Sequence, residues 1–352
     1  MDSREARSLP ILIGDKTFTV TSDDEYLANM RGTFEPETVA LLRTLVKPGG
    51  VALDVGANVG CTALLLSGLA STTLAFEPSR TTFNFLRMNL EAAGVKNVTA
   101  VNAGLGAEPA ILALAIPPVC RGSGVVTDTP LADHIMESIE IVRGDEAVRR
   151  ALPNVGVDFI KIDVEGYELG VLQGLAETLA RDRPVVTFEL NHWALNVFRR
   201  MTVPDFLEAV CDIFPVLYAV GRGPAVDLHD ADARYLMMHE HIVHFDYMAL
   251  VGAFDESKIG AFLDRYVVNP APRPPAVDLH ARVATLEAER LALEQALNAE
   301  REAKRSVQDD LSASLAAANA RANQVQAELE AVRNTVSWRV TKPLRAVKIL
   351  MQ

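Results

Sequence analysis

The sequence predicts an α/β domain, with a largely parallel sheet between two layers of helices, followed by one long helix. Two observations lead to this prediction. Between residues 34 and 255, short apolar segments rich in β-branched residues alternate with helical segments, which is typical of parallel sheets covered on both faces. From residue 278 to 336 the chain has no Pro or Gly and is dominated by strong helix formers.

The alternation defines the expected elements one by one. Strands are expected at residues 51–55, 73–76, 98–102, 157–162, 185–190 and 216–220, with a further strand-like run at 242–251 that would complete the sheet. Helices are expected at residues 62–69, 81–93, 169–179 and 203–211. Ligands of such a sheet bind outside the carboxyl ends of its strands, so polar residues at those ends are the candidate site.

Composition narrows the class of protein. The 352 residues are 49% apolar, enough for one substantial core, and the net charge of −12 excludes general nucleic-acid binding. Cys61, Cys120 and Cys211 are scattered and form neither a disulfide framework nor a zinc spacing. We therefore expect a cytoplasmic protein, since residues 1–8 carry no apolar signal core and no run of 18 apolar residues occurs.

The first polar motif follows the first expected strand. Residues 51–60 read V-A-L-D-V-G-A-N-V-G, so Asp54 ends an apolar run, Gly56 supplies a turn with bare backbone, and Gly60 stands where a helix can begin. The free N–H groups of that helix suit a carboxylate. Glu77, 23 positions after Asp54 and at the tip of the next strand, suits a ribose diol.

The spacing of this motif indicates which ligand it binds. It is D-x-G-x-x-x-G and not the G-x-G-x-x-G of dinucleotide sites, which favours a ligand with a small carboxylate over one with phosphates. S-adenosylmethionine fits, because it carries an amino-acid end and a ribose. The alternative is a purely structural strand-to-helix turn.

A second motif, D-F-I-K-I-D-V-E-G-Y-E, occupies residues 158–168. On a strand, Lys161, Asp163 and Glu165 share one face. Three ionisable groups are costly in a buried strand, so we expect them at its exposed carboxyl end, with Glu189 of the next strand at the same rim. Contact with substrate or an ion is one interpretation, and a structural ion pair of Lys161 is the other.

Together the motifs resemble a known family. Residues 49–60 preceded by F-E-P-E at 34–37, F-E-P at 76–78, the 158–168 motif and F-E at 188–189 are similar to the FkbM family of S-adenosylmethionine-dependent methyltransferases. The resemblance covers about residues 34–200. It implies a seven-stranded Rossmann-like sheet whose last strand is antiparallel, and methyl transfer to an oxygen, often a sugar hydroxyl of a polysaccharide or natural product.

The resemblance also implies roles for single residues. Asp54, Gly56 and Asn58 would surround the methionine end, while Glu77 would hold the ribose and Asn102 would border the adenine. Ala57 and Gly60 belong to the same cofactor-binding turn. The segment 117–138 departs from the family pattern as an insertion, so no site residue is assigned there.

A sugar hydroxyl is a weak nucleophile, and a base or a metal must help remove its proton. Asp163, Glu165 and Glu189 are the candidates, either directly or through a divalent ion, and Lys161 would orient the acceptor or balance these carboxylates. His192 is as well explained by a hydrogen bond at a helix start as by acid–base work. The histidines of residues 238–244 lack a metal-site spacing and are expected at a strand entry.

Composition divides the chain into five parts. These are an N-terminal segment 1–33, the methyltransferase-like domain 34–268, a Pro-rich linker 269–277, a coiled coil 278–336 and a basic amphipathic tail 337–352. The coil follows two heptad seams separated by a stutter after Leu311, and Arg290, Glu300 and Lys304 interrupt the first. The seam positions are Leu279, Val283, Leu286, Leu293, Leu297, Val307 and Leu311, then Leu315, Ala318, Ala322, Val325, Leu329, Val332 and Val336. We expect a homo-oligomer, dimer or trimer.

The tail has basic residues, a tryptophan and no acid, and it suits either an anionic membrane interface or a partner protein. Residues 336–345 resemble the end of coiled-coil segments in bacterial cell-surface polysaccharide enzymes, which implies work near the inner face of the cytoplasmic membrane. Two functions therefore remain. One is an O-methyltransferase acting on a cell-surface glycan, and the other is an assembly scaffold for glycan-synthesis enzymes with a degenerate methyltransferase domain.

Overall fold

The computed structural model describes residues 5–268 and 279–334, and side chains are described in all of these except residues 279–287. The chain divides into two units, Met1–Pro274 and Pro275–Gln352, so the division falls in the Pro-rich linker expected at 269–277. That linker, Val336 and the basic tail 337–352 lie outside the described residues.

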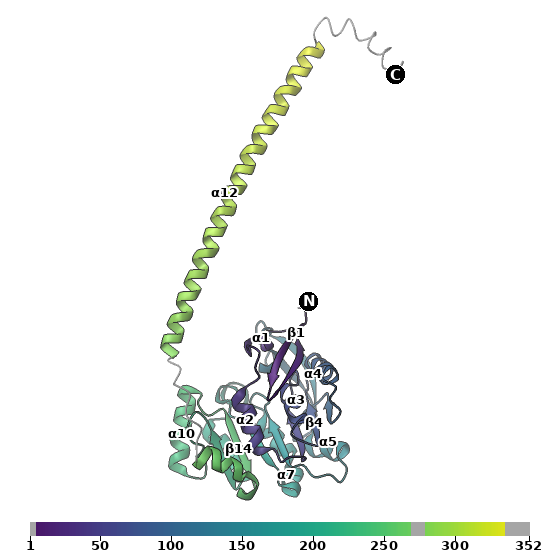
Figure 1. Cartoon of the computed structure of the whole chain (residues 1–352), viewed down its shortest axis with the longest axis vertical. Coiled ribbons are helices and arrows are strands. Elements are labelled where there is room, and N and C mark those ends of the chain that lie inside the picture. Colours follow the sequence, from purple (N-terminus) through teal and green to yellow (C-terminus); the bar gives the residue numbers. More distant parts are fainter. Residues whose placement is uncertain (1–4, 269–278, 335–352) are drawn as a thin grey trace, which may run out of the picture. The chain divides into compact units, whose positions relative to one another are not determined.

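The first unit is organised around one large sheet (Figure 1). Its strands, in spatial order, are β13 (Val226–Asp227), β12 (Val216–Val220), β14 (Ala249–Ala253), β11 (Val185–Glu189), β10 (Phe159–Ile162), β3 (Val51–Val55), β4 (Thr72–Phe76) and β5 (Val98–Val101). Strands β5, β4, β3, β10 and β11 run parallel, and β14 is antiparallel to both of its neighbours. The predicted α/β fold with its last long strand reversed is confirmed. Seven strands were expected, but the sheet has eight, because β13 adds a two-residue strand at its edge.

Helices cover both faces of this sheet, as predicted. They are α1 (Tyr26–Asn29), α2 (Pro36–Leu45), α3 (Cys61–Ser67), α4 (Arg80–Ala92), α5 (Gly144–Ala151), α6 (Glu168–Gly174), α7 (Ala176–Asp182), α8 (His192–Ala194), α9 (Val203–Ile213), α10 (Ala231–His244) and α11 (Gly260–Phe262). Successive side chains of β3 point to opposite faces. Ala52 belongs to a core shared with α2, α3 and α4, whereas Leu53 belongs to a core shared with α5, α6 and α9.

Two smaller sheets flank the large one. The hairpin of β1 (Arg7–Ile13) and β2 (Lys16–Ser22) packs its buried Ile11, Ile13 and Val20 into the first of these cores. The other sheet has the order β6 (Gly104–Gly106), β9 (Ile135–Arg143), β7 (Ala110–Ile116) and β8 (Val125–Val126). The segment 117–138, expected to be an insertion, therefore contributes β8 and the start of β9.

Two expected elements were wrong. Residues 242–251 are not one strand, because α10 continues to His244, Phe245 ends it with a positive φ of 54°, and β14 begins only at Ala249. The histidine segment 238–244 is accordingly helical. The helix is capped at its N-terminus by the Asp230 side chain, which accepts hydrogen bonds from the N–H groups of Asp232 and Ala233. This cap lies well before the residues that were expected to form the strand.

The expected helix 169–179 is divided into α6 and α7. The division falls at Gly174 and Leu175, where the backbone approaches β6 so closely that a Cβ on Gly174 would lie 2.0 Å from the carbonyl oxygen of Gly106. A continuous helix with a side chain at this position would collide with that strand.

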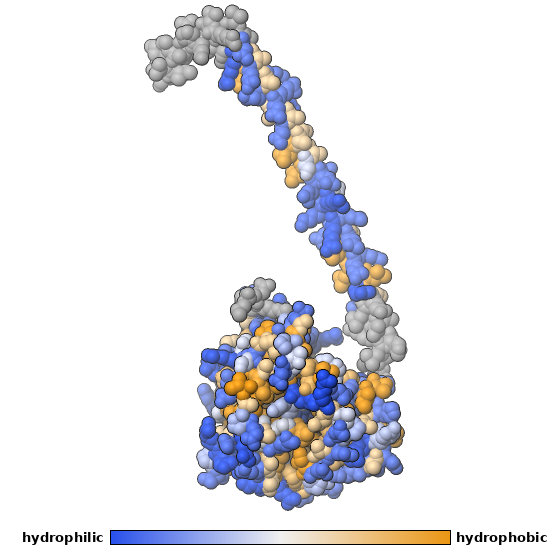
Figure 2. Space-filling model, turned by 180° about the vertical axis from the view of Figure 1, so that it is seen from behind, coloured by the Kyte–Doolittle hydropathy of each residue, from blue (hydrophilic) through white to orange (hydrophobic). Residues whose placement is uncertain are grey.

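The second unit contains the long helix α12 (Leu279–Asn334), which confirms the predicted C-terminal helix. Its described side chains are exposed, including Leu293, Leu297, Val307, Leu311 and Leu315. Figure 2 shows apolar side chains in patches along this helix, separated by a hydrophilic stretch. Within the described residues, no helix has both the length and the apolar character needed to cross a bilayer.

Candidate cofactor and acceptor site

Two adjoining cavities lie at the carboxyl ends of the central strands. The larger, of about 320 Å³, is lined by residues at the carboxyl ends of β3, β10 and β11 together with residues of α2. The smaller, of about 70 Å³, lies toward the ends of β4 and β10 and the small sheet. Both are lined by Gly56, Asn58, Gly122 and Asp163, so the two cavities meet at these residues. This is the edge of the sheet where the fold places ligands.

The turn after β3 forms the boundary between the cavities. Gly56 has φ +83°, and a Cβ there would lie 1.8 Å from the carbonyl oxygen of Asp163. The N–H groups of Gly56 and Ala57 donate to the carbonyl of Phe76 at 3.0 and 2.9 Å. Gly60 caps the start of α3 with φ +102°. Only glycine fits at Gly56, because the backbone is left-handed there and two loops are in contact.

Glu77 ties this turn to the end of β4. Its carboxylate accepts hydrogen bonds from the N–H groups of Asn58 at 3.0 Å and Ser79 at 2.9 Å. Its side chain is buried and lines the smaller cavity. Burial raises the pKa of Glu77 to about 7, although both hydrogen bonds oppose the shift. The carboxylate still has free lone pairs that can accept hydroxyl donors from the cavity.

Asp54 and Lys161 are opposite each other in register on β3 and β10. The Lys161 ammonium lies 3.7 Å from Asp54 and 3.0 Å from Asp163, and its side chain is 11% exposed. Burial raises the pKa of Asp54 to about 6, with Lys161 opposing the shift. For Lys161, burial favours the neutral form, but Asp163 and Asp54 outweigh it and raise the pKa. Lys161 therefore stays charged, serving both as a structural ion-pair partner and as a wall of the larger cavity.

Three carboxylates gather where the two cavities meet: Asp163 lines both, Glu189 the larger and Glu165 the smaller. One oxygen from each of Asp163, Glu165 and Glu189 lies within 4.8 Å of the others. Asn191 donates to Glu165 at 2.8 Å. One Glu189 oxygen is buried without a hydrogen-bond partner. Such a set can share a proton or hold one divalent ion through oxygen ligands.

Mutual repulsion and burial make this cluster a proton acceptor near neutral pH. Burial, with Asp163 and Glu168 next, raises the pKa of Glu165 to about 8. Burial and the neighbouring Asp163 and Glu165 raise the pKa of Glu189 well above its usual value. A carboxylate shifted in this direction is suited to accept a proton from a hydroxyl group at neutral pH.

The structure brings most of the sequence-predicted residues together. Gly56, Ala57, Asn58, Glu77, Lys161, Asp163, Glu165 and Glu189 line one or both cavities. Asp54, Gly60 and Asn102 line neither. Asp54 is fully buried behind Lys161, and the Asn102 amide donates to the carbonyls of Glu77 and Pro78, so it shapes the end of β4.

His192 lies outside both cavities. It hydrogen-bonds the buried His241 of α10 at 3.2 Å, and its ring packs against Phe245. Burial, followed by His192, lowers the pKa of His241 to about 4, so this histidine stays neutral in the packed pair. The helix start at this point is capped by Asn191, which accepts from Ala194 N–H at 3.0 Å. His192 therefore packs against α10, while Asn191 makes the hydrogen bond at the helix start.

Several lining residues were not assigned from the sequence, and four of them carry polar groups or shape the junction of the cavities. Tyr26 and Glu35 line the larger cavity, Arg121 lines the smaller, and Gly122 lines both. Burial raises the pKa of Glu35, against a hydrogen bond from Thr38 at 2.9 Å. The F-E-P-E signal contained Glu35, but Tyr26, Arg121 and Gly122 stand in segments without a recognisable motif.

Part of this chain resembles a known protein family. Residues 54–212 match the model of the FkbM methyltransferase domain. The chain contains an FkbM-type methyltransferase domain. The match starts at Asp54 and ends in α9, so it includes the glycine turn, Glu77 and the three carboxylates.

Two curated proteins are similar to part of this chain. The chain is 33% identical over 142 residues to Methyltransferase 1 of Beauveria bassiana, covering 35% of this chain and 57% of that protein. It is 31% identical over 166 residues to the hexuronic acid methyltransferase AglP of Haloferax volcanii, covering 46% of this chain and 65% of that protein. The matches thus span less than two thirds of either relative.

A solved structure of an FkbM methyltransferase from Methylobacillus flagellatus is also similar. It shares 16% sequence identity with this chain and has a TM-score of 0.36. The match covers 64% of this chain and 52% of that one.

Proposed function

We propose that this chain transfers the methyl group of S-adenosylmethionine to a sugar hydroxyl. The observation that carries the proposal is the hydrogen bond between Glu77 and the N–H of Asn58. This hydrogen bond holds a carboxylate that can bind the ribose diol of the cofactor next to the glycine turn, whose N–H groups can bind the amino-acid end of the cofactor. The name of the relative AglP, a hexuronic acid methyltransferase, supports a sugar acceptor.

The residues present fit this cofactor. Gly56 leaves bare backbone at the junction of the two cavities, Glu77 lines the smaller cavity, and Lys161 offers a cation in the larger one. The larger cavity falls within the usual size range of small-molecule sites. The cofactor, when bound, supplies a methyl group activated by the neighbouring sulfonium.

The protein contributes orientation and proton removal. Glu189, with Glu165 within 4.8 Å, would accept the proton of the attacking hydroxyl. Asp163 is held in place by Lys161 at 3.0 Å. Positioning the acceptor oxygen in line with the methyl carbon supplies most of the acceleration. Asp163, Glu165 and Glu189 would also hold a divalent ion, which would lower the pKa of the hydroxyl.

Calorimetry and methyl transfer test this function together. The full-length protein is titrated with S-adenosylmethionine and S-adenosylhomocysteine, and then incubated with labelled cofactor and a panel of hexuronic acids and lipid-linked glycans. Parallel reactions with a chelator, with and without added Mg²⁺ or Mn²⁺, decide whether the carboxylates act alone. Absence of binding at millimolar cofactor would leave the scaffold function in its place.

Replacing Glu77 with alanine is expected to weaken S-adenosylmethionine binding. The diol loses its charged acceptor and Asn58 loses its partner, so the dissociation constant should rise roughly 10- to 100-fold. Titration calorimetry measures it, with Glu91→Ala on the exposed side of α4 as the control. An unchanged dissociation constant for Glu77→Ala would remove the ribose role.

We also propose that α12 joins copies of this chain. Leu311 and Leu315 are 69% and 62% exposed and stand at the junction of the two seams, so Leu311→Glu with Leu315→Glu should place charges in the apolar seam and yield monomers. Sedimentation equilibrium gives the mass. Ala313→Glu, on the other side of the helix, should leave the oligomer intact, and a parent that is already monomeric would disprove the proposal.

A further inference from the structure

A loop without any recognised motif lies directly over the glycine turn. Residues 117–124, called the strap below, connect β7 to β8 and contain Gly122, which lines both cavities. A Cβ on Gly122 would lie 2.6 Å from the side-chain nitrogen Nδ2 of Asn58 and 3.8 Å from the ring of Tyr26. The strap therefore touches Asn58 where the two cavities meet.

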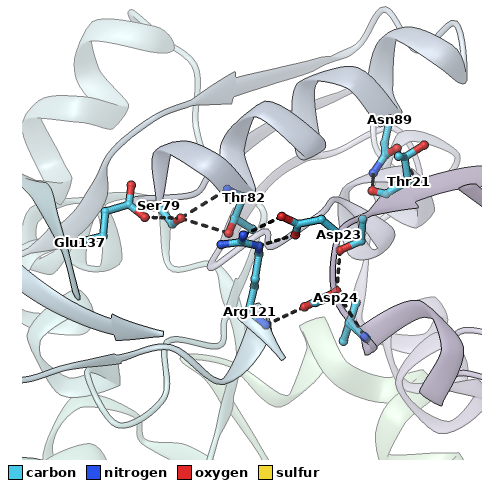
Figure 3. A network of polar contacts seen from close by, with 10 residues as sticks. Thr21, Asp23, Asp24, Ser79, Thr82, Asn89, Arg121 and Glu137 are labelled. Atoms are coloured by element: carbon cyan, nitrogen blue, oxygen red, sulfur yellow. Dashed lines mark hydrogen bonds and ion pairs between the residues drawn. The ribbon is translucent and has the colours of Figure 1, made fainter. Parts of the chain in front are cut away.

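The strap is held by the N-terminal segment (Figure 3). The Arg121 guanidinium donates two hydrogen bonds to the Asp23 carboxylate, at 2.6 and 2.7 Å, and the Arg121 N–H donates to Asp24 at 2.7 Å. The N–H of Glu25 donates to the carbonyl of Val119 at 3.1 Å. The side chains of Arg121 and Asp23 are only 13% and 17% exposed, so this bidentate pair is shielded from solvent far better than an ordinary surface ion pair.

The same aspartates organise the cavity wall. Asp24 also accepts hydrogen bonds from the Ser22 hydroxyl at 2.5 Å and the Tyr26 N–H at 3.3 Å. This fixes the turn between β2 and α1, which carries Tyr26 into the lining of the larger cavity. Breaking the contact to Arg121 would thus release the strap and leave Tyr26 without its neighbour.

The chain that follows the strap is fixed beside Glu77, the proposed ribose acceptor. Glu137 of β9 accepts hydrogen bonds from the Ser79 hydroxyl at 2.8 Å and the Arg80 N–H at 2.6 Å, as Figure 3 shows for Ser79. The N–H of Ser79 in turn donates to Glu77. Glu137 thus fixes β9 beside the smaller cavity. The strap itself is held by its contacts to the N-terminal segment, which are those of Arg121 and of the Val119 carbonyl.

We propose that Arg121, Asp23 and Asp24 form a latch that closes the strap over the bound cofactor, so that latch opening controls how fast cofactor and product leave. This inference rests on the proposed function. A ligand that extends from one cavity to the other passes Gly122 and Asn58, which are in contact in this structure. The strap must lift for such a ligand to enter or leave, and the shielded ion pair opposes lifting. Arg121 is a positioning residue, since it acts through the strap.

The test measures S-adenosylhomocysteine release from full-length protein by stopped-flow displacement with excess unlabelled ligand. Arg121→Ala should release it at least about tenfold faster than the parent. The double variant Asp23→Arg with Arg121→Asp should restore slow release by rebuilding the pair in reverse. Arg43→Ala, which removes the exposed ion pair with Asp15 on the same N-terminal hairpin, is the matched control and should release at the parental rate.

A second variant keeps the latch testable if Arg121→Ala does not fold. Gly122→Ala keeps the ion pair but inserts a methyl group against Asn58, so it should also speed release. Slow release in both Arg121→Ala and Gly122→Ala would overturn the latch while leaving the proposed function intact. A parent that does not bind S-adenosylhomocysteine would overturn both.

Discussion

Gly56→Ala is expected to cause the largest loss of stability of any single substitution in the cofactor site. The added Cβ would lie 1.8 Å from the carbonyl oxygen of Asp163, a backbone atom that can move only if β10 moves. Left-handed backbone at φ +83° adds its own cost. We expect the free energy of unfolding to fall by roughly 2–5 kcal/mol and cofactor binding to be lost.

A second glycine separates backbone strain from the collision. Gly49 has φ +72°, and a Cβ added there would meet no atom within 4 Å, so Gly49→Ala should cost only about 1–2 kcal/mol and leave binding unchanged. Urea denaturation gives the free energies and calorimetry gives the dissociation constants. An equal fall in the free energy of unfolding of the two variants would show that the close approach of Gly56 to Asp163 does not contribute to the destabilisation.

Glu189→Gln is expected to cause the largest loss of activity. Glu189 lines the larger cavity, and one of its oxygens is buried without a hydrogen-bond partner. The amide keeps the shape of the side chain but cannot accept the hydroxyl proton, so turnover should fall roughly a hundred- to ten-thousandfold. Because Glu189 lines the larger cavity and Glu77 the smaller, cofactor affinity should stay near the parental value. Glu140→Gln, on an exposed position of β9, is the control.

The pH dependence of turnover provides an independent check. Burial and the neighbouring carboxylates raise the pKa of Glu189 and Glu165, the latter to about 8, so at pH 6 the pair holds a proton that blocks the base. The parental rate should therefore rise with pH and level off above about pH 8. Glu189→Gln should lose this rise, and a variant with parental rate and profile would exclude Glu189 as the base.

The same shift makes a prediction about stability. A carboxyl group whose pKa is higher in the folded protein than in the unfolded chain binds more protons when folded. Its stabilising contribution is complete below the unfolded value and is lost as pH rises through the folded value. Parental stability should thus fall between about pH 4.5 and pH 8, and Glu189→Gln should unfold at higher temperature than the parent at pH 8, as expected where function has been favoured over stability.

Much of the fold was predictable because local pattern and tertiary context agree. The buried strand ending at Asp54, the turn at Gly56 and the helix after Gly60 follow from residue types and their spacing. The expected strand at residues 242–251 was wrong because its β-branched and aromatic residues resemble a strand, whereas the helix that begins at the Asp230 cap continues to His244. The division between α6 and α7 could not be foreseen, because it depends on the approach of Gly174 to Gly106.

The sequence by itself determined the α/β class, the long terminal helix and the residues at the ends of β3, β4, β10 and β11, since these follow from periodicity and from glycines and acids placed at strand ends. Only the tertiary structure decided that Asp54 is buried behind Lys161 and that Arg121 pairs with Asp23, 98 positions earlier in the chain. Contacts between segments so far apart leave no mark on local spacing. They exist because the folded sheet brings the N-terminal hairpin and the strap to the same edge.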